Sequence, residues 1–366
     1  MKILLDNFIF ELQYAGGISK VWFNLIKRLK EKNNSNISFI EGNQLNNLFR
    51  RELNLKADNI ISDKTGSKLL RRFLSVDNND CDIYHSSYFR PLKNKGNSKV
   101  IVTVHDFIYE KYSGHIPKTI HIFLKKRALK QADAIICVSE HTRQDFYKYY
   151  PEIDRNSVHV VHNGVDELYQ PIKTKDTLKI KGLTLKKGNF LLYVGNRGYC
   201  KNFPFIIKLM NSKSVKDRKL HLICVGGGHP SEKENKQLEG EAIQGQITFL
   251  SDISSLELNE LYNYAHTLLF PSIYEGFGIP AIEAMKTGCP IWSTNSSSVK
   301  EILGSDYPIS FDPTNWDQAL STFELLCTAN TRERARVIGL EQSKKFSWNK
   351  CSEETYTIYN NLLNNE

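Results

Sequence analysis

Two carboxylates on either side of a glycine-rich turn are the residues of this sequence with the clearest chemical use. Glu275 and Glu283 stand eight positions apart, and between them come, in order, Gly276, Phe277, Gly278, Ile279 and Pro280. The apolar run 267–270 predicts a buried strand, and residues 280–288 predict a helix that stops at a glycine. The start of such a helix presents free backbone N–H groups and the positive end of the helix dipole, which suit a phosphate. The two acids can then contact opposite ends of a ligand whose diphosphate lies between them.

Taken one at a time, Glu275 is explained as a loop acid and Glu283 as a solvated acid on a helix face. Their spacing argues for more. Glu, seven residues, Glu, with Gly-Phe-Gly-Ile-Pro inside and Glu-Ala-Met at the end, resembles the signature of family 4 of the retaining glycosyltransferases, which have the GT-B fold. The resemblance implies that Glu275 faces the donor sugar and that Glu283 binds the ribose hydroxyls of the nucleotide.

Two cations follow a second apolar run. Residues 189–195, NFLLYVG, predict a buried strand, and Arg197 and Lys201 lie in the loop after it. Two cations four positions apart can clamp both phosphates of a diphosphate, although ordinary loop cations look the same. The resembled family has Arg and Lys in this loop as diphosphate ligands. This implies that Arg197 and Lys201 stabilise the leaving nucleoside diphosphate, so that no metal is required.

The N-terminal half predicts an α/β domain with a parallel sheet. Runs that predict strands alternate with helical segments, and they are residues 2–6, 37–41, 82–86, 99–105, 134–139 and 158–162. Gly16 and Gly17 lie between the first strand and a helix predicted over 21–29. A plain turn explains such a pair, but in the resembled family a Gly-Gly loop here borders the donor phosphates. Lys20 stands where that family often has Arg.

His105 and Asp106 lie where the strand over 99–105 leaves the sheet. Ligands of open α/β sheets bind at the carboxyl ends of strands, although a single His there is more often structural. His-Asp at this place resembles mannosyltransferase-like members of the family. It implies that His105 contacts the donor sugar and that Asp106 lines the cleft or faces the acceptor. GDP-mannose is then the favoured donor, and other hexose or deoxyhexose donors also fit.

The C-terminal half repeats the strand and helix alternation. Further strands are predicted at 220–226, 247–250 and 290–294. Asp252 follows the second of them, and in the resembled family the corresponding strand and loop lie beside the base of the nucleotide. No GxGxxG with a following acid opens either half, which disfavours an NAD enzyme.

The resemblance implies two Rossmann-like domains facing across a cleft: 1–172 on the acceptor side and 173–347 for the nucleotide. A linker is expected at about 170–188, and a C-terminal helix at about 348–366 is expected to rejoin the first domain.

Length and composition agree with two globular domains. The chain has 366 residues, of which 40% are hydrophobic and 24% charged. Its seven cysteines stand singly with no CxxC, which predicts reduced thiols in a cytosolic protein and no metal cluster. Neither a signal peptide nor an apolar run of about 18 residues is present, so we expect a protein that is neither exported nor membrane-spanning.

The net charge of +9 is concentrated in the N-terminal half. Residues 1–172 carry 26 Lys and Arg against 19 Asp and Glu, and the remainder carries 23 against 21. A basic half can attract an anionic membrane or substrate, whereas no nucleic-acid-binding motif accompanies the charge. The helix over 118–131 and the run 69–74 mix apolar and basic residues, as helices that dock on anionic lipid do. A core-packed helix with a solvated basic face explains them equally well.

The function implied by the resemblance is transfer of a hexosyl unit, with mannose favoured and configuration retained, from a nucleoside-diphosphate sugar. The acceptor would be a hydroxyl of a growing surface polysaccharide, such as an O-antigen of lipopolysaccharide or a capsule, or of a lipid-linked glycan. Two alternatives remain open: a sugar-nucleotide epimerase or hydrolase on the same fold, and a non-catalytic nucleotide-binding partner.

Overall fold

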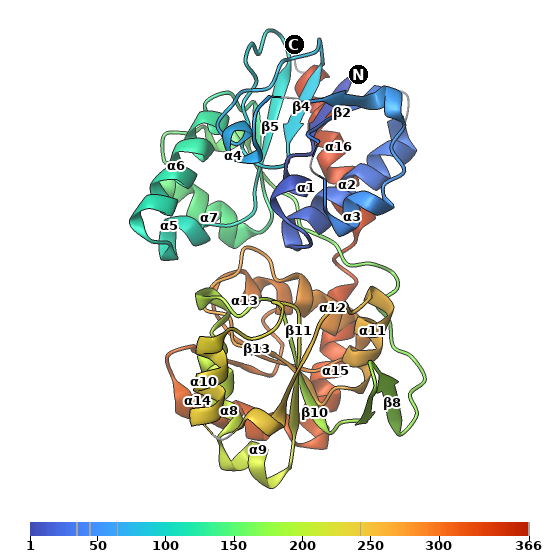
Figure 1. Cartoon of the computed structure of the whole chain (residues 1–366), viewed down its shortest axis with the longest axis vertical. Coiled ribbons are helices and arrows are strands. Elements are labelled where there is room, and N and C mark those ends of the chain that lie inside the picture. The colour runs from blue at the N-terminus through green and yellow to red at the C-terminus, as the bar shows by residue number, and fades with distance from the viewer. Residues whose placement is uncertain (34–35, 44, 64, 242, 365–366) are drawn as a thin grey trace. The chain divides into compact units, whose positions relative to one another are not determined.

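The chain divides into two compact units in the computed structural model, which describes residues 1–33, 36–43, 45–63, 65–241 and 243–364 (Figure 1). Unit 1 comprises Met1–Gly164 and Ser347–Glu366, and unit 2 comprises Val165–Phe346. Residues 165–172, which the sequence pattern assigns to the first domain, pack within unit 2. The backbone N–H groups of Gln170 and Ile172 donate to the side chains of Asn259 and Asn263 in helix α11, Ser255–Tyr264, at 3.1 and 3.0 Å.

Unit 1 contains a seven-stranded parallel sheet in the order β3-β2-β1-β4-β5-β6-β7. The strands are β1 Ile3–Asp6, β2 Ile37–Glu41, β3 Ile60–Ser62, β4 Ile83–Ser86, β5 Lys99–Val104, β6 Ala134–Cys137 and β7 Val158–Val160. Six of them were predicted from the sequence and are confirmed. The order reverses between β1 and β4, which makes this a doubly wound sheet.

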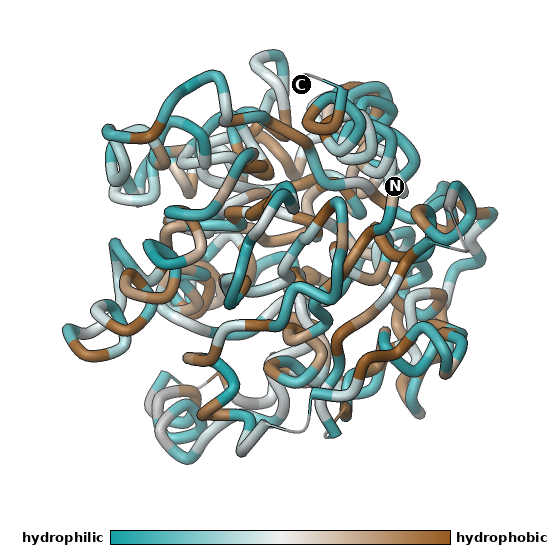
Figure 2. The backbone as a smooth tube through the Cα atoms, turned by 90° about the horizontal axis from the view of Figure 1, so that it is seen from above, coloured by the Kyte–Doolittle hydropathy of each residue, from teal (hydrophilic) through white to brown (hydrophobic). Residues whose placement is uncertain are grey.

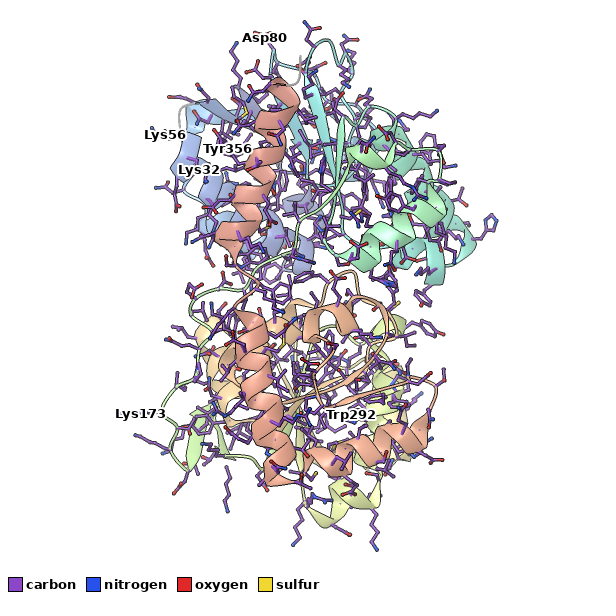
Figure 3. All side chains as sticks on the ribbon, turned by 180° about the vertical axis from the view of Figure 1, so that it is seen from behind. Lys32, Lys56, Asp80, Lys173, Trp292 and Tyr356 are labelled. Atoms are coloured by element: carbon purple, nitrogen blue, oxygen red, sulfur yellow. The ribbon has the colours of Figure 1, made fainter. Side chains whose placement is uncertain are left out.

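Helices cover both faces of this sheet, with α5, α6 and α7 on one side and α2 and α16 on the other (Figure 1). The helices of unit 1 are α1 Ile9–Leu12, α2 Gly17–Asn33, α3 Leu48–Glu52, α4 Lys68–Arg71, α5 Ile108–Tyr112, α6 His115–Leu129, α7 Glu140–Tyr149 and α16 Trp348–Asn364. The C-terminal helix α16 packs along α2. Arg28 Nε donates to Asn349 at 2.6 Å, and the Lys32 ammonium lies 5.6 Å from the centre of the Tyr356 ring (Figure 3).

Unit 2 contains a six-stranded parallel sheet in the order β12-β11-β10-β13-β14-β15, reversing between β10 and β13. Its strands are β10 Phe190–Val194, β11 His221–Val225, β12 Ile247–Leu250, β13 Thr267–Phe270, β14 Ile291–Thr294 and β15 Ser310–Phe311. Its helices are α8 Phe203–Met210, α9 Lys213–Asp217, α10 Glu232–Gly240, α11 Ser255–Tyr264, α12 Ile279–Thr287, α13 Ser297–Leu303, α14 Trp316–Leu326 and α15 Ala329–Ser343. Both units are therefore doubly wound α/β domains, as predicted.

Part of the expected linker over 170–188 is an antiparallel hairpin of β8, Thr177–Ile180, and β9, Leu183–Lys186. Leu178 and Ile180 are buried while Thr177 and Lys179 are exposed, the alternation of a strand with one face on the core. Lys181 and Gly182 form the turn with φ of 47° and 78°, as two-residue hairpin turns require. The segment is rich in lysine and its apolar alternation is short, so its composition does not indicate a strand.

The core of unit 2 keeps the strands next to the candidate site in place. Trp292 of β14 is fully buried, and its ring centroid lies 4.4 Å from that of Phe311 and 6.0 Å from that of Phe205. Figure 3 shows Trp292 inside the unit and Lys173 directed away from it. The outer helices alternate between hydrophobic and hydrophilic positions in Figure 2, as helices with one face on a sheet do.

Candidate functional site

The turn between β13 and α12 has the predicted form. β13 is buried throughout and ends at Phe270, and α12 begins at Ile279 with a proline in its first turn. Gly278 takes a left-handed conformation with φ 106°, which explains glycine at this position. Gly276 and Phe277 are buried as well, and Ile279 is half-buried. α12 ends at Gly288, as expected.

The carboxylate of Glu275 is held by two donors on one oxygen. Lys201 Nζ and Ser272 Oγ each lie 2.6 Å from Oε1 of Glu275. The side chains of Glu275 and Lys201 are 9% and 20% exposed, so water screens this ion pair only in part. Lys201 follows β10 and Glu275 follows β13, the neighbouring strands at which the sheet order reverses. Because open α/β sheets bind ligands at this point, the structure joins a cation and an acid where a ligand is expected.

A serine-rich turn after β14 fixes the loop that carries Glu275. The Ser297 hydroxyl accepts the backbone N–H of Glu275 at 2.9 Å. The Ser298 hydroxyl donates to the carbonyls of Glu275 and Phe277, both at 2.9 Å. Ser297 has φ 51°, a conformation that costs a non-glycine residue free energy. The sequence indicates only that residues 295–298 cap a helix, so their contact with Glu275 is not visible before folding.

Glu283 lies inside unit 2. The residue is 3% exposed, and its Oε2 accepts a hydrogen bond from the Tyr262 hydroxyl at 3.0 Å. Burial, and then the Glu283 charge, raise the pKa of Tyr262 well above its ordinary value, so that the tyrosine remains a donor. Glu283 is therefore not the solvated helix-face acid of the simpler interpretation. It lies on the second turn of α12, about one turn after Gly278 as expected.

Arg197 lies in the loop after β10, and its side chain packs against the glycine-rich loop after β11. Its Nε donates to Glu234 at 2.6 Å, and its terminal nitrogens donate at 3.2 to 3.3 Å to the carbonyls of four consecutive residues, Gly226, Gly227, Gly228 and His229. The Arg197 side chain is 5% exposed. The hydrogen bond from Arg197 lowers the pKa of Glu234 to about 2. The guanidinium thus orders a loop whose three glycines all have positive φ, and it is not paired with Glu275 as Lys201 is.

Asp252 lies apart from the Glu275 turn within unit 2. It is exposed in the turn after β12, with φ 52°, and β12 is the sheet edge two strands from β10. Its place beside the base of the nucleotide stays a prediction.

Gly16 and Gly17 lie at the start of α2 in unit 1. Ser19 donates its backbone N–H to Gln13 Oε1 at 3.3 Å, and Gly16 donates to the Ser19 hydroxyl at 3.1 Å. A Cβ on Gly16 would stand 2.5 Å from Gln13 Oε1, so a larger residue there would displace the end of the Gln13 side chain. The helix begins four residues before the predicted start at 21 because these contacts cap it.

His105 and Asp106 directly follow β5, as predicted. Burial, and then the nearby Lys125 cation, lower the pKa of His105 to about 4, so its imidazole is neutral near pH 7. The Asp106 carboxylate accepts the backbone N–H of Ile108, the first residue of α5, at 3.0 Å. Lys125 Nζ donates to the Asp106 carbonyl at 3.1 Å and to Glu110 at 2.5 Å. A buried lysine thus positions the His-Asp turn.

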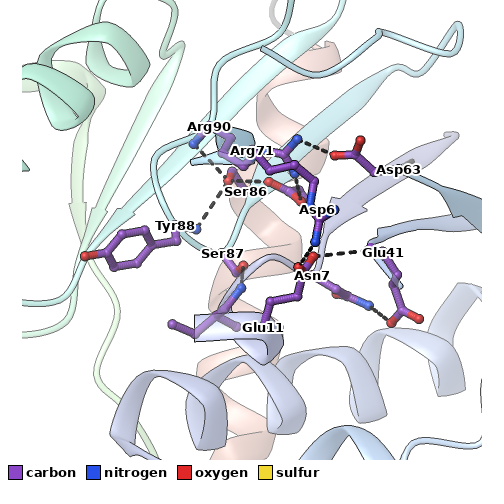
Figure 4. A network of polar contacts seen from close by, with 12 residues as sticks. Asp6, Asn7, Glu11, Glu41, Asp63, Arg71, Ser86, Ser87, Tyr88 and Arg90 are labelled. Atoms are coloured by element: carbon purple, nitrogen blue, oxygen red, sulfur yellow. Dashed lines mark hydrogen bonds and ion pairs between the residues drawn. The ribbon is translucent and has the colours of Figure 1, made fainter. Parts of the chain in front are cut away.

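The carboxyl ends of β1, β2 and β4 carry a buried polar network that sequence reasoning missed (Figure 4). Its ion pairs are Arg90 with Asp6 and Asp63, Arg71 with Glu11, and Arg50 with Glu41. The partners stand up to 84 positions apart along the chain, so no local pattern indicates them. Each carboxylate has an arginine partner, so its charge is compensated although it is buried.

The described residues contain neither a candidate metal cluster nor a helix fit to span a membrane. No group of three or more His, Cys, Asp or Glu side chains is arranged to hold a metal ion in the part of the chain that the structure describes. In the same residues, no helix combines the length and apolarity needed to cross a bilayer.

Comparison with known proteins gives matches over nearly the whole chain. The family described as "Glycosyltransferase Family 4" matches residues 15–167, and the family "Glycosyl transferases group 1" matches residues 174–341. "O-antigen chain mannosyltransferase B" of Escherichia coli is 26% identical over 367 residues, which cover 98% of this chain and 92% of that protein. "O-antigen chain mannosyltransferase RfbU" of Salmonella typhimurium is 31% identical over 237 residues, 63% of this chain and 62% of that protein.

Solved structures share the fold at low identity. A sucrose-phosphate synthase from Thermosynechococcus elongatus superposes with a TM-score of 0.76 at 15% identity, over the whole of both chains. An Anabaena protein, Alr3699/HepE, in complex with UDP and glucose gives 0.71 at 13% identity, over 98% of both chains. At these identities the likeness is evidence of a common fold.

Proposed function

The chain belongs to family 4 of the group 1 glycosyltransferases and has their GT-B fold, and on that basis we propose that it transfers a hexosyl unit, mannose in the first place, from a nucleoside-diphosphate sugar to a glycan hydroxyl with retention of configuration. The observation that supports this most directly is the 2.6 Å ion pair of Lys201 and Glu275. It lies at the switch point of the nucleotide-side sheet, in the turn that leads into α12.

In the proposed reaction, the diphosphate leaves from the anomeric carbon and the acceptor oxygen bonds to the same face of an oxocarbenium-like sugar. The departing phosphate oxygen takes the acceptor's proton. Glu275 positions the sugar and supports its developing positive charge, and the Lys201 cation stabilises the leaving group in place of a metal. The N–H groups at the start of α12 suit a diphosphate oxygen, and Glu283 binds the ribose.

Arg197 remains a proposed second diphosphate ligand, and the geometry adds a condition to that role. Its guanidinium must first leave Glu234 and the carbonyls of the 226–229 loop. In unit 1 we propose His105 as a sugar-binding residue, since a neutral imidazole both donates and accepts hydrogen bonds. Asp106, Gly16 and Gly17 are proposed to support substrate binding there.

Mannose and the acceptor are inferred from the relatives. The two curated proteins above are named as O-antigen chain mannosyltransferases, which favours GDP-mannose as the donor and a surface polysaccharide on a lipid carrier as the acceptor. The Anabaena structure contains UDP, so uridine donors are the main competitors. None of the seven cysteines, all among the described residues, forms a disulfide, which favours a reducing compartment. We therefore propose that the chain meets a lipid-linked acceptor at the inner face of the plasma membrane.

A panel of nucleotide sugars tests the proposal through binding, slow donor hydrolysis and transfer to a lipid-linked acceptor. We expect GDP-mannose to be hydrolysed and transferred fastest. Glu275→Ala should abolish transfer while nucleotide binding persists, and Glu341→Ala, at an exposed acid of α15, should behave as wild type. Normal turnover by Glu275→Ala would remove its role. Interconversion of sugars without an acceptor would point to an epimerase instead, and nucleotide binding without any turnover would contradict an enzymatic role.

A further inference from the structure

The turn after β4 is strained and tightly anchored. Phe89 has φ 53°, which a bulky side chain adopts only at a cost in free energy. The Ser86 hydroxyl accepts the backbone N–H groups of Tyr88 and Arg90 at 3.3 and 3.2 Å. The Tyr84 hydroxyl donates to the Arg90 carbonyl at 2.9 Å. Such strain persists only where the surroundings fix the backbone, and it is common at sites that bind ligands.

The buried polar network fixes this turn from its other side (Figure 4). Through its pairs with Asp6 and Asp63, the Arg90 guanidinium joins the turn to the segments that end and follow β1 and β3. Ser86 Oγ also donates to Asp6 at 3.0 Å. Because the sheet order reverses between β1 and β4, the turn lies at the switch point of unit 1, where open α/β sheets bind ligands. The network therefore holds a strained turn at the place where a ligand of unit 1 is expected.

The turn sends two neighbouring aromatic side chains in different directions. The Phe89 ring is buried, and its centroid lies 5.5 Å from that of the His121 ring. Tyr88 is half-buried, and Figure 4 shows its ring directed away from the polar network. Burial raises the pKa of Tyr88 to about 12, so its hydroxyl keeps its proton at neutral pH. The strained backbone thus presents a tyrosine hydroxyl after the carboxyl end of β4.

Arg72, directly after α4, is the charged neighbour of Tyr88. It donates to the Tyr88 hydroxyl at 3.3 Å, and its guanidinium carbon lies 5.5 Å from the centre of the Tyr88 ring. Among the described residues Arg72 has no carboxylate partner, whereas Arg71 and Arg90 of the network each pair with an acid. Its buried Nε also has no hydrogen bond in this part of the chain. The protein's own contacts therefore leave hydrogen-bond donors of this guanidinium unused.

Ring contacts connect Tyr88 to the turn that carries Asp106. The centroid of the His121 ring lies 6.2 Å from that of Tyr88, and His121 stacks on Tyr109 at 4.3 Å. Tyr109 belongs to α5, which begins two residues after Asp106. The Asp106 charge is close enough to raise the pKa of Tyr88 further, after burial has done so. The surroundings of Tyr88 thus contain a carboxylate as well as a guanidinium, a mixture that suits the hydroxyl groups of a neutral sugar better than an anion.

We propose that Tyr88 and Arg72 bind a sugar ring of the acceptor glycan through its hydroxyl groups, and so contribute to the choice of acceptor. The inference rests on the proposed function for what the acceptor is. The Tyr88 hydroxyl accepts from Arg72 and donates its own hydrogen to a sugar oxygen. The planar guanidinium donates to two neighbouring sugar oxygens, and the Asp106 carboxylate accepts from a sugar hydroxyl. The strain at Phe89 is then explained by the position that it gives Tyr88.

Binding of simple sugars to the full chain tests the proposal without any transfer. The probes are the methyl glycosides of common hexoses and N-acetylhexosamines, followed by saturation-transfer NMR with GDP present. We expect at least one of them to bind. Tyr88→Phe removes only the hydroxyl and should raise the Kd of that glycoside about fivefold. Arg72→Gln should raise it about tenfold or more, because hydrogen bonds from a charged donor are stronger.

α7 supplies a matched pair for control. The Arg155 guanidinium carbon lies 4.8 Å from the centre of the Tyr147 ring. Arg155 precedes β7, whereas Tyr88 follows β4, so the two pairs stand at opposite ends of the parallel strands. Tyr147→Phe and Arg155→Gln should each change the Kd of the glycoside less than about twofold.

Three results would overturn the proposal: a panel of which no glycoside binds, a glycoside whose Kd is the same in wild type, Tyr88→Phe and Arg72→Gln, and equal losses from the control pair. Hydrolysis of nucleotide sugars by the wild-type chain separates these results from the proposed function. A chain that hydrolyses its donor but binds glycosides without help from Tyr88 and Arg72 contradicts this inference alone. Glycoside binding that depends on both residues, in a chain without donor turnover, contradicts the proposed function alone.

Discussion

The Ser297 hydroxyl lies 2.9 Å from the backbone nitrogen of Glu275, and Ser297 keeps this contact in a left-handed conformation with φ 51°. A non-glycine residue pays about 1 kcal/mol or more for that backbone. A hydrogen bond makes a net contribution of about 1 kcal/mol to the free energy of unfolding, so the gain from the contact and the cost of the strain nearly cancel. The arrangement is therefore explained better by the position it gives Glu275 than by stability.

Replacing Ser297 with glycine separates these two effects. Ser297→Gly relieves the backbone strain and removes the hydroxyl, so we expect a free energy of unfolding within about 1 kcal/mol of wild type. Because the loop with Glu275 loses one of its anchors, kcat should fall by roughly tenfold while nucleotide affinity is kept. Urea denaturation and steady-state kinetics measure the two quantities.

Lys219 provides the control for the backbone. It is exposed with φ 51° in the turn before β11, so Lys219→Gly gives the same relief away from Glu275. It should leave kcat unchanged. If Ser297→Gly keeps full kcat, the serine is structural and its positioning role is wrong.

Removal of the Lys201 charge should affect both chemistry and folding. Lys201→Met leaves the Glu275 carboxylate, which is 9% exposed, without its cation, and breaking such a shielded pair costs up to about 3 kcal/mol. Loss of a cation that stabilises the leaving diphosphate should lower kcat/KM about 10²- to 10³-fold. Lys201→Arg restores charge but not the compact ammonium, so partial recovery is expected. Unchanged kcat/KM in Lys201→Met would show that the lysine only supports Glu275 in the fold.

Local patterns in the sequence account for most of the fold and for the Glu275 turn. Apolar runs such as 189–195 and 267–270 form the central strands, and glycines 278 and 288 bound α12 as their conformations require. Periodicity and special backbone geometry depend on neighbours in the chain, which is why these features are readable in advance. Strand β3 and the β8–β9 hairpin were not predicted because their strands are only three or four residues long, too short for a clear apolar pattern.

Contacts between distant segments account for what could not be predicted. Ser297 reaches Glu275 across 22 positions and Glu234 reaches Arg197 across 37, and neither partner has a distinctive local pattern. The same limit applies to Lys125, which looks like one basic residue among several but is buried against Glu110 and the His-Asp turn. Such pairs form only when the fold brings two distant segments together, and the sequence of one segment does not indicate which residue of the other it will contact.

Stability should fall as the pH drops below about 6.5. Burial lowers the histidine pKa to about 3 for His85 and His266 and to about 4 for His105. Above the ordinary value of 6.5 both folded and unfolded chains hold these imidazoles neutral, and no pH effect arises. Between 6.5 and the folded values only the unfolded chain binds the protons, so acid favours unfolding. Below about 3 the loss is complete.

His85 offers a way to isolate one of these contributions. Its two ring nitrogens lie 2.6 Å from the Tyr359 hydroxyl and 2.8 Å from Thr103 Oγ1. His85→Gln keeps polar atoms in this site but removes the titration, so its denaturation midpoint should fall less between about pH 7 and pH 5 than that of wild type. A wild-type midpoint that stays level or rises over this range would contradict the sign.

Release of Arg197 from Glu234 should strengthen donor binding. The Glu234 pKa of about 2 means that the acid stays charged at every usable assay pH, so only substitution removes its pull on the guanidinium. In Glu234→Gln the arginine loses its charged partner and keeps the weaker carbonyl contacts at 3.2 to 3.3 Å. If Arg197 binds the diphosphate, the Kd for GDP should fall by roughly three- to tenfold, because a charged pair no longer competes. Glu239→Gln, which removes an exposed acid further along α10, is the matched control and should leave the Kd unchanged. A higher Kd for GDP in Glu234→Gln would mean that the Arg197–Glu234 pair orders the 226–229 loop for the nucleotide. Arg197 would then act on the donor through that loop.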